Sequence, residues 1–411
     1  MAPKFNQNYD TTDSNEKELE EFDRLMSDDV ICISDSSDDG YKQPPIDNAA
    51  RQPEFQQDDL EKLPFPKGTV KLTHMLGEKK SGDYFTFTDV IQPDKLRKAL
   101  LTAFVLDMEW LKPHFRADTK LVIVRSYDPN SEHQGVLQSA DGMTTIVNPE
   151  FGGVKYPIMH SKIMLLFYDN YVRFVASSAN LIEIDWTRMQ NIVFIQDIRL
   201  DVSQVFKPTE FGATLAQALR DLSVPEQVTK QLDHMDMSRV EVHIVTSVPT
   251  TRERKKYHAS AYGMARLAQV TRQLRRESPV LRDIDLTETD ICCYGSSMGK
   301  LTDAYLRDFY CCAMGMTWGE IELPRTLVHA KVILMRAGPE RRHGWMYVGS
   351  HNFSPGAWGR LKRHQLGLAF VNNYEFGVVI PNMHYETVFG HDSVSRRGAR
   401  IPLPFKLAWT P

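Results

Sequence analysis

Residues 156–180 read YPIMHSKIMLLFYDNYVRFVASSAN, and residues 325–352 read RTLVHAKVILMRAGPERRHGWMYVGSHN. Each stretch has an apolar lead-in, a His-x-Lys, an aliphatic run, a polar turn, a second apolar run and a final Asn. The His and the Asn are 20 residues apart in the first stretch and 23 in the second, and the extra length falls in the turn. Because surface turns tolerate insertions best, the two stretches indicate an internal duplication of one functional unit.

The aliphatic run that follows each His-x-Lys indicates a buried strand. Residues i and i+2 of a strand point to the same face, so the His and the Lys of each unit project together. A second strand then returns and places the Asn at its end. If the two copies pack as pseudo-symmetric halves, one site collects two histidines, two lysines and two asparagines: His160, Lys162, Asn180, His329, Lys331 and Asn352.

These side chains suit an anionic, tetrahedral substrate. Two ammonium groups and two amide donors would stabilise the charge on a phosphoryl group and on its transition state. One histidine can attack phosphorus, while the other protonates the leaving oxygen and later activates water. Since lysine can neutralise the charge that a metal ion neutralises elsewhere, we expect no metal and no cofactor.

Four further motifs accompany the paired units: SANLIEIDW (178–186), SSMG (296–299), SHNFSPGAWG (350–359) and YEFGVVI (374–380). Together they resemble the phospholipase D superfamily and, more narrowly, its tyrosyl-DNA phosphodiesterase branch, in particular the eukaryotic type 1 members. The usual superfamily unit has an Asp five residues after the Lys. This chain has Phe167 and Arg336 there, as that branch does. The resemblance covers about residues 65–410.

The resemblance implies a role for each residue of the duplicated unit. His160 would be the nucleophile and His329 the general acid and base, while the lysines and asparagines would hold the phosphate oxygens. Glu375 would orient His160 and fix its tautomer. The partner that orients the second histidine would be Gln190, although the family spacing fits Asn191 about as well.

Other positions match residues that bind DNA in the family. Tyr156 stands where the family has an aromatic ring that stacks on a base, and Ser296 and Ser297 match a serine pair that binds the backbone. Each has an ordinary structural alternative: Tyr156 could pack in the core or at its rim, and the serines could form the turn after DICCYG.

Residues 1–60 differ in composition from the rest of the chain. They hold 16 acidic and 5 basic residues, so they carry a net charge of −11, and the chain total of −4 leaves +7 on residues 61–411. Abundant Asp, Glu, Ser, Asn and Gln with few large apolar groups is the signature of disorder. A mildly basic body is compatible with a nucleic-acid surface.

One apolar island interrupts the acidic segment, at DDVICISDSSDD (28–39). It resembles a SUMO-interacting motif, which would add as a strand to a sheet edge of SUMO or a SUMO-modified protein while its acids meet a basic rim. A chance apolar island fits nearly as well. The motif would favour a nuclear location, and its core would be Val30, Ile31, Cys32 and Ile33.

The pattern of elements predicts an α/β fold in which two pseudo-symmetric phospholipase D-like halves, each a mixed sheet flanked by helices, form an α-β-α-β-α sandwich with one shared active site. We expect a disordered acidic segment over 1–60, the first half over 61–235 and the second over 236–411. Strands are predicted over 120–128, 191–198 and 240–249, and helices over 95–115 and over 208–234 with a break at Pro225.

The sequence also lacks long apolar runs and metal-type cysteine spacing. There is no run of 18 apolar residues and no apolar N-terminal region, so we expect neither a membrane span nor a secretory signal. The five cysteines show no C-x2-C spacing, which favours reduced thiols. We expect a monomer.

The resemblance implies a DNA repair phosphodiesterase that hydrolyses the bond between a topoisomerase I tyrosine and a DNA 3′-phosphate through a covalent phosphohistidine. Its partners would be single- or double-stranded DNA with a 3′-phosphotyrosyl group or another 3′ adduct, and the topoisomerase-derived peptide. Two alternatives stay open. A phospholipase D-type phospholipid hydrolase would need an apolar lip and normally the missing Asp, and a non-catalytic nucleic-acid- or SUMO-binding adaptor would keep only the fold.

Overall fold

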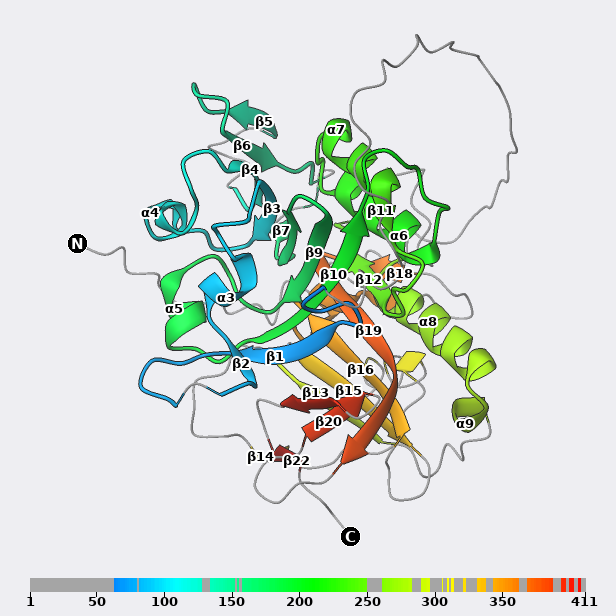
Figure 1. Cartoon of the computed structure of the whole chain (residues 1–411). Helices are drawn as coiled ribbons and strands as arrows, with labels where there is room; N and C mark the ends of the chain where they lie inside the picture. The colour runs from blue at the N-terminus through cyan, green and yellow to red at the C-terminus, as the bar shows by residue number, and fades with distance from the viewer. Residues whose placement is uncertain are drawn as a thin grey trace, which may run out of the picture. The chain divides into compact units, whose positions relative to one another are not determined.

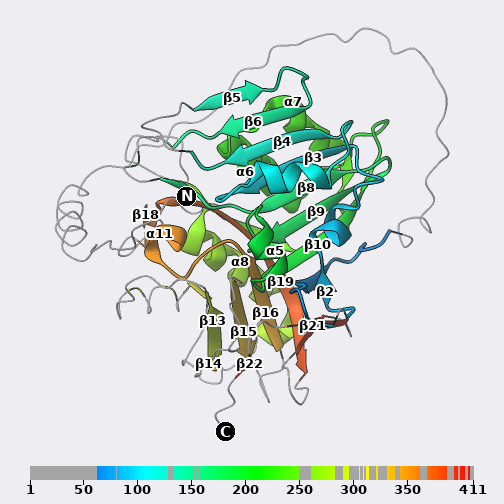
Figure 2. The ribbon, with the colours of Figure 1, turned by 90° about the vertical axis from the view of Figure 1, so that its left-hand side faces the viewer.

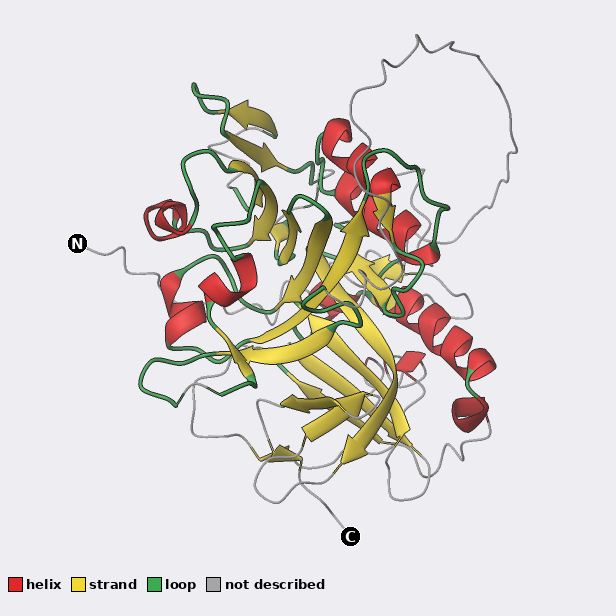
Figure 3. Cartoon of the chain, viewed as in Figure 1, coloured by secondary structure: helices red, strands yellow, loops and turns green. Residues whose placement is uncertain are grey.

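A computed structural model gives the architecture of the chain, which divides into two units, residues 1–54 and 55–411. The residues it describes are 63–79, 81–127, 134–151, 154, 157–249, 261–282, 290–295, 305, 309, 312–313, 321–322, 331–337, 343–361, 368–386, 393–396, 399–402 and 406–407. Residues 28–39, with the candidate SUMO-interacting core, lie outside this set. The described part mixes strands and helices, which confirms the predicted α/β class (Figure 3).

The larger described sheet is formed by ten strands: β1 (Thr69–Thr73), β2 (Tyr84–Phe85), β3 (Lys98–Ala103), β4 (Lys120–Arg125), β5 (Gly135–Gln138), β6 (Thr144–Asn148), β8 (Ile163–Phe167), β9 (Tyr171–Ser177), β10 (Ile192–Leu200) and β11 (Met235–Asp236). Their spatial order is β2-β1-β10-β9-β8-β3-β4-β6-β5, with β11 beside β10. Figure 2 shows the run from β10 to β5. The strand that follows the first His-x-Lys and the strand that leads to Asn180 are neighbours at the centre, β8 and β9.

The second sheet has eight described strands: β7 (Ile158–Met159), β12 (His243–Ser247), β13 (Asp290–Tyr294), β15 (Val332–Ala337), β16 (His343–Gly349), β19 (Asn373–Glu386), β20 (Ser393–Arg396) and β21 (Ala399–Pro402). The path β13-β15-β16-β19-β20-β21 runs through it, and both β12 and β7 pair with β19 (Figure 1). Two short pairs complete the described strands: β14 (Ile321–Glu322) with β22 (Lys406–Leu407), and β17 (Arg360–Leu361) with β18 (Leu368–Phe370).

The described helices are mostly short: α3 (Phe87–Ile91), α4 (Met108–Leu111), η1 (Lys112–His114), α5 (Glu183–Thr187), α6 (Glu210–Asp221), α7 (Glu226–Thr229), η2 (Lys230–His234), α8 (Gly263–Glu277), α9 (Pro279–Arg282) and α11 (Pro355–Trp358). Pro225 is the N-cap of α7, which confirms the predicted break between 208 and 234. The predicted strands over 120–128, 191–198 and 240–249 are confirmed as β4, β10 and β12.

The helix predicted over 95–115 is wrong. Residues Lys98–Ala103 form β3, which pairs parallel with β4 and antiparallel with β8. The helical part is confined to α4, capped by the Asp107 side chain, and the 3-10 helix η1 that follows it. Both faces of β3 are buried, as the full burial of Leu100 and Leu101 shows. A strand buried on both faces reads as a continuous apolar run, and such a run does not distinguish strand from helix.

The core joins the two sheets. The largest cluster of buried apolar side chains contains residues of both sheets and of helices α6 and α8. Phe174 of β9 and Phe376 of β19 lie with ring centroids 6.0 Å apart within it. A second cluster, which includes Leu101 of β3 and Val175 of β9, covers the other face of the ten-stranded sheet. Burial between the sheets therefore fixes the positions of β9 and β19, the strands that carry candidate site residues.

Candidate active site

His160 lies where the chain passes between the sheets. Ile158–Met159, which immediately precede it, pair in parallel with β19, and its backbone N–H donates to the Tyr374 carbonyl at 2.9 Å. The chain then returns to the first sheet as β8. The second half of the chain thus holds the backbone of a histidine that belongs to the first half.

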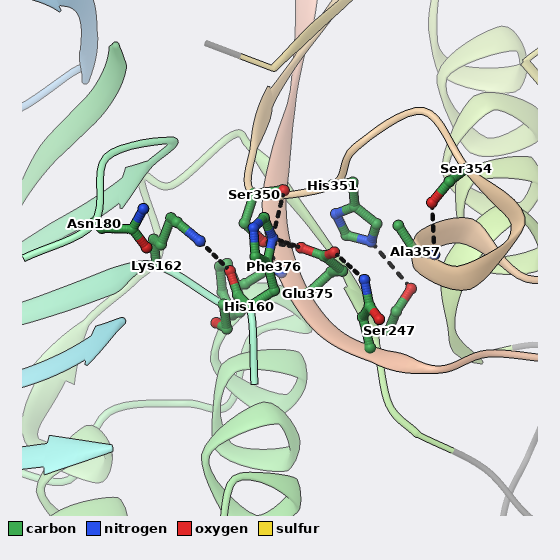
Figure 4. Close-up of polar contacts among 12 residues, drawn as sticks. His160, Lys162, Asn180, Ser247, Ser350, His351, Ser354, Ala357, Glu375 and Phe376 are labelled. Carbon is green, nitrogen blue, oxygen red and sulfur yellow. Dashed lines mark hydrogen bonds and ion pairs between the residues drawn. The ribbon is translucent and has the colours of Figure 1, made fainter. Parts of the chain in front are cut away.

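The His160 ring also reaches the second half. Its Nδ1 lies 2.9 Å from Glu375 Oε2 and 3.1 Å from the Ser350 carbonyl oxygen (Figure 4). Both partners are acceptors, so Nδ1 carries the proton and Nε2 of the neutral ring keeps its lone pair. Burial lowers the pKa of His160 to about 4, so the ring is neutral at pH 7. An imidazole with a free Nε2 is a nucleophile that is ready to react.

Glu375 is itself held by hydrogen bonds. Ser350 Oγ donates to its Oε2 at 2.6 Å, and Asn373 Nδ2 donates to its Oε1 at 2.9 Å. Burial alone would raise the pKa of Glu375, but its pairing with His160 outweighs burial and lowers that pKa to about 2. Glu375 is therefore a carboxylate at neutral pH, and its fixed position sets the orientation of the imidazole.

The two lysines of the His-x-Lys units belong to one site. Lys162 and Lys331 are only 2% and 1% exposed. Burial lowers the pKa of Lys162 to about 8 and the pKa of Lys331 well below its usual range, and Glu375 and Asp185 oppose this shift at both lysines. Lys162 also lowers the pKa of Lys331. The effect of one lysine on the other shows that the duplicated units converge. Within the first unit, Lys162 Nζ donates to the His160 carbonyl at 2.8 Å.

Asp185 orients Asn180 and was missed by the sequence analysis. Its Oδ2 accepts from Asn180 N at 2.6 Å and from Asn180 Nδ2 at 3.0 Å, while Val105 N donates to Asn180 Oδ1 at 3.2 Å. These contacts use the amide oxygen and one of the two amide hydrogens. The signal for Asp185 was present, because it is an acidic residue within the SANLIEIDW motif and beside a buried Trp.

The two halves repeat one hydrogen-bond frame around their serines. Ser350 N donates to the Phe376 carbonyl at 2.8 Å, and Ser178 N donates to the Ile192 carbonyl at 3.1 Å. The residue before Phe376 is Glu375, which accepts from Ser350 Oγ. The residue before Ile192 is Asn191, whose Oδ1 accepts from Ser178 Oγ at 2.8 Å. Asn191 is therefore the counterpart of Glu375.

Gln190 occupies a different place in this frame. It corresponds to Tyr374, and neighbouring residues of an extended chain point to opposite faces. Asn191 is fully buried, whereas Gln190 is half-buried. The correspondence thus favours Asn191 over Gln190 as the partner of the second histidine.

Phe104 forms an apolar wall beside His160, and the sequence did not point to it. Its ring centroid lies 5.4 Å from that of His160, and its side chain is 39% exposed. Lys162 Nζ lies 6.0 Å from the centroid of the same ring. The incorrect helix over 95–115 hid this position, which follows directly after β3.

Several predicted site residues lie outside the described residues: Tyr156, Ser296, Ser297 and His329. Asn352 is described and half-buried, two positions after Ser350 in the sequence. Within the described ranges, no group of three or more His, Cys, Asp and Glu side chains could hold a metal ion, and no helix is long and apolar enough to cross a membrane.

Comparison with known proteins places this geometry in a family. The model of the tyrosyl-DNA phosphodiesterase family matches residues 69–322 and 313–411. Tyrosyl-DNA phosphodiesterase 1 of Arabidopsis thaliana is 20% identical over 368 residues, which cover 72% of this chain and 58% of that protein. The chain thus spans less than two thirds of the length of this curated relative.

Solved structures show the same fold. The crystal structure of yeast tyrosyl-DNA phosphodiesterase has a TM-score of 0.59 at 16% identity, covering 82% of this chain and 95% of that one. A mutant of the yeast protein has a TM-score of 0.60 at 15% identity with the same coverage. The likeness confirms the predicted fold class. Because the family model covers more than half of the sequence, this chain belongs to the tyrosyl-DNA phosphodiesterase family.

Proposed function

We propose that this protein is a DNA repair phosphodiesterase that hydrolyses the bond between a tyrosine and a DNA 3′-phosphate, the adduct left by a stalled topoisomerase I. The observation that carries the proposal is the His160–Glu375 pair, which joins the two halves beside two buried lysines. It supplies a neutral nucleophile and a cationic pocket for one phosphoryl group. Membership of the tyrosyl-DNA phosphodiesterase family supports the choice of substrate.

The first step is attack by His160 Nε2 on phosphorus. A P–N bond forms, the bond from phosphorus to the tyrosine oxygen breaks, and His329 gives its proton to that oxygen. The imidazole gains positive charge as it attacks, and the Glu375 carboxylate at Nδ1 stabilises that charge. Tyrosine is a tolerable leaving group because the pKa of its phenol is about 10.

The second step removes the phosphoryl group from His160. His329, now neutral, takes a proton from water, the water oxygen attacks phosphorus, and the P–N bond breaks to release a 3′-phosphate. Asn191 is the residue we propose as the orienting partner of His329, in place of Gln190. The water is a poorer nucleophile than the imidazole, so this step depends more on its base.

The lysines and asparagines stabilise the transferring phosphoryl group in both steps. The low pKa values of Lys162 and Lys331 are those of an empty, buried site. A bound phosphodiester adds negative charge within reach of both ammonium groups, and an opposite charge favours their protonated form. The amide hydrogen of Asn180 that Asp185 leaves available, together with Asn352, would complete the donor set.

The proposal also includes the substrates, the location and the partners expected from the sequence. The substrates would be single- or double-stranded DNA carrying a 3′-phosphotyrosyl peptide or another 3′ adduct, with Tyr156 stacked on a base and Ser296 and Ser297 on the backbone. The protein would act in the nucleus as a monomer without metal or cofactor, and residues 28–39 would bind SUMO or a SUMO-modified protein.

The test is cleavage of a 3′-phosphotyrosyl oligonucleotide in excess EDTA, with wild type and His160→Ala compared. Product with a 3′-phosphate from the wild type alone is the expected result. Activity that requires added Mg²⁺ would overturn the proposed chemistry. Cleavage of phospholipid vesicles but not of DNA would favour the phospholipid hydrolase, and tight DNA binding without turnover would favour the adaptor.

A further inference from the structure

The two asparagines that end the duplicated units sit on turns with different central residues. The first Asn turn, residues 178–180, reads SAN, and the second Asn turn, residues 350–352, reads SHN. His351 thus stands where the first half has Ala179. Since the serines of the two turns make matching backbone hydrogen bonds, the substitution falls within an otherwise repeated frame.

Three side chains hold the first Asn turn. Ser177 Oγ accepts from Ala179 N at 2.9 Å, and Asp185 Oδ2 accepts from Asn180 N at 2.6 Å. Trp186 Nε1 donates to the Asn180 carbonyl at 2.8 Å. Each anchor stands at a fixed offset from the Asn, so its counterpart in the second half can be identified by counting.

The second Asn turn lacks all three anchors. The residue before Ser350 is Gly349, which has no hydroxyl, and Ala357 stands at the offset of Asp185. The offset of Trp186 is occupied by Trp358, whose buried Nε1 has no hydrogen-bond partner among the residues that the structure describes. The Ser350 hydroxyl, which bonds Glu375 and accepts from Phe376 N, holds the start of the turn, but these three anchors of the first half have no equivalent.

His351 supplies a different set of contacts. It is 3% exposed, and its Nε2 lies 3.0 Å from Ser247 Oγ (Figure 4). Its Nδ1 is hydrogen-bonded to the Tyr347 hydroxyl. Its ring lies 4.2 Å from that of Trp358, centroid to centroid, at 32°. The anchoring Trp of the first half has therefore become a stacking partner in the second.

Two glycines in the sheet leave room for the Tyr347 hydroxyl. Gly349 and Gly377 pair across β16 and β19, and a Cβ on either one would overlap the Tyr347 hydroxyl. The glycines thus leave space for this hydroxyl to reach His351. Ser247 pairs with Glu375 across β12 and β19, so the clamp and the catalytic carboxylate share one sheet.

We propose that His351 is a positioning residue that clamps the second Asn turn through Ser247 and Tyr347. The turn carries three groups of the proposed site: the Ser350 hydroxyl bonded to Glu375, the Ser350 carbonyl at His160 Nδ1, and Asn352. His351 touches no substrate in this role. The role in catalysis rests on the proposed function, whereas the clamp itself does not.

The test compares His351→Ala with wild type in single-turnover cleavage of a 3′-phosphotyrosyl oligonucleotide. We expect the rate constant to fall roughly 10- to 100-fold, because small displacements of positioning groups are costly, with little change in the enzyme concentration that gives half-maximal rate. A purely structural role would instead lower the amplitude, as fewer molecules are folded. His114→Ala is the matched control, since His114 also packs against a tryptophan, at 4.8 Å, but lies off the turn.

Two further measurements keep the outcome decisive. Amide hydrogen exchange over residues 348–353 should speed up in His351→Ala but not in the control. Adding Ala357→Asp to His351→Ala restores an acid at the Asp185 offset and should slow exchange and recover part of the rate. Unchanged rate and exchange in His351→Ala, or a double variant identical to it, would overturn the clamp. If the wild type cleaves no substrate, the proposed function is wrong, but hydrogen exchange still tests the clamp.

Discussion

Each half holds a polar side chain with a serine hydroxyl, and the two side chains differ in charge. In the second half a serine hydroxyl holds the Glu375 carboxylate, which binds His160. In the first half the equivalent serine holds the neutral amide of Asn191. The duplication has kept the hydrogen-bond frame and changed one group. A carboxylate stabilises an imidazole that becomes positive on attacking phosphorus, so this difference supports the nucleophilic role that we propose for His160.

The halves also differ in how they fill the same place in the sheet. Arg173 on β9 and Asp197 on β10 form a fully buried pair, with Nε to Oδ1 at 2.7 Å. The positions at matching offsets in the second half are Trp345 and Pro381, next to a β-bulge in the pairing of β16 with β19. One half thus fills this position with a charged pair and the other with apolar side chains.

The largest effect is expected from removing the histidine of either half. His160→Ala should lower cleavage by about 10⁴-fold or more, as loss of a nucleophile does in other covalent enzymes, and should form no DNA adduct. His329→Ala should accumulate an adduct, because tyrosine leaves more readily than water attacks. Denaturing gels of each variant with labelled oligonucleotide measure both. An adduct on His160→Ala would reverse the assignment.

The second expected effect concerns stability alone. Asp197→Ala leaves the Arg173 guanidinium buried without its carboxylate and removes an acceptor of Phe65 N, so it should lower the free energy of unfolding by about 3–5 kcal/mol. Urea titration of the variant measures the loss. Asp169→Ala, which breaks the exposed pair with Arg97, is the control and should change little. Equal losses in both would contradict the distinction.

The third prediction replaces the Glu375 carboxylate by a neutral amide, the group that the first half has in Asn191. Glu375→Gln keeps an acceptor near Nδ1 but removes the charge, as Asn191 does in the first half, and should lower kcat about 10²-fold. Steady-state cleavage measures it. Asn373→Ala, which removes only the bond to Oε1, is the milder control. Similar losses in both variants would mean that the charge of Glu375 is not what matters.

The pH profile gives a signature of the same pair. Attack needs neutral His160, whose pKa is about 4, so kcat/KM of the wild type should be lost as pH falls through about 4. It should also be lost above about 8, where Lys162 of the free enzyme gives up its proton. Because Glu375 raises the pKa of His160, Glu375→Gln should move the acid limb to lower pH. An acid limb near the ordinary histidine value would contradict the effect of burial.

The sequence predicted the α/β class and several strands but misread one part of the chain path. His160, Lys162 and Lys331 come close enough to shift one another's pKa values, although His160 and Lys162 lie in the link between β7 and β8 and not on the strand that the sequence predicted. The strand at 98–103 was missed, since an apolar run of that kind has no period. Asp185 and His351 were missed for another reason: each acts through hydrogen bonds of a turn, to Asn180 in one case and to Ser247 and Tyr347 in the other, and a residue pattern does not specify such bonds.

The smallest expected effect separates two neighbouring residues. Asn191 matches Glu375 in the frame and Gln190 does not, so Asn191→Ala should slow the second step about 10-fold, at the lower end of the range for general acid–base effects. The first step should suffer less, because its leaving group needs less help from His329. The variant should therefore accumulate adduct, whereas Gln190→Ala should not. Quench-flow measurement of adduct decay compares the two, and a slower decay in Gln190→Ala alone would restore the assignment that the sequence first suggested.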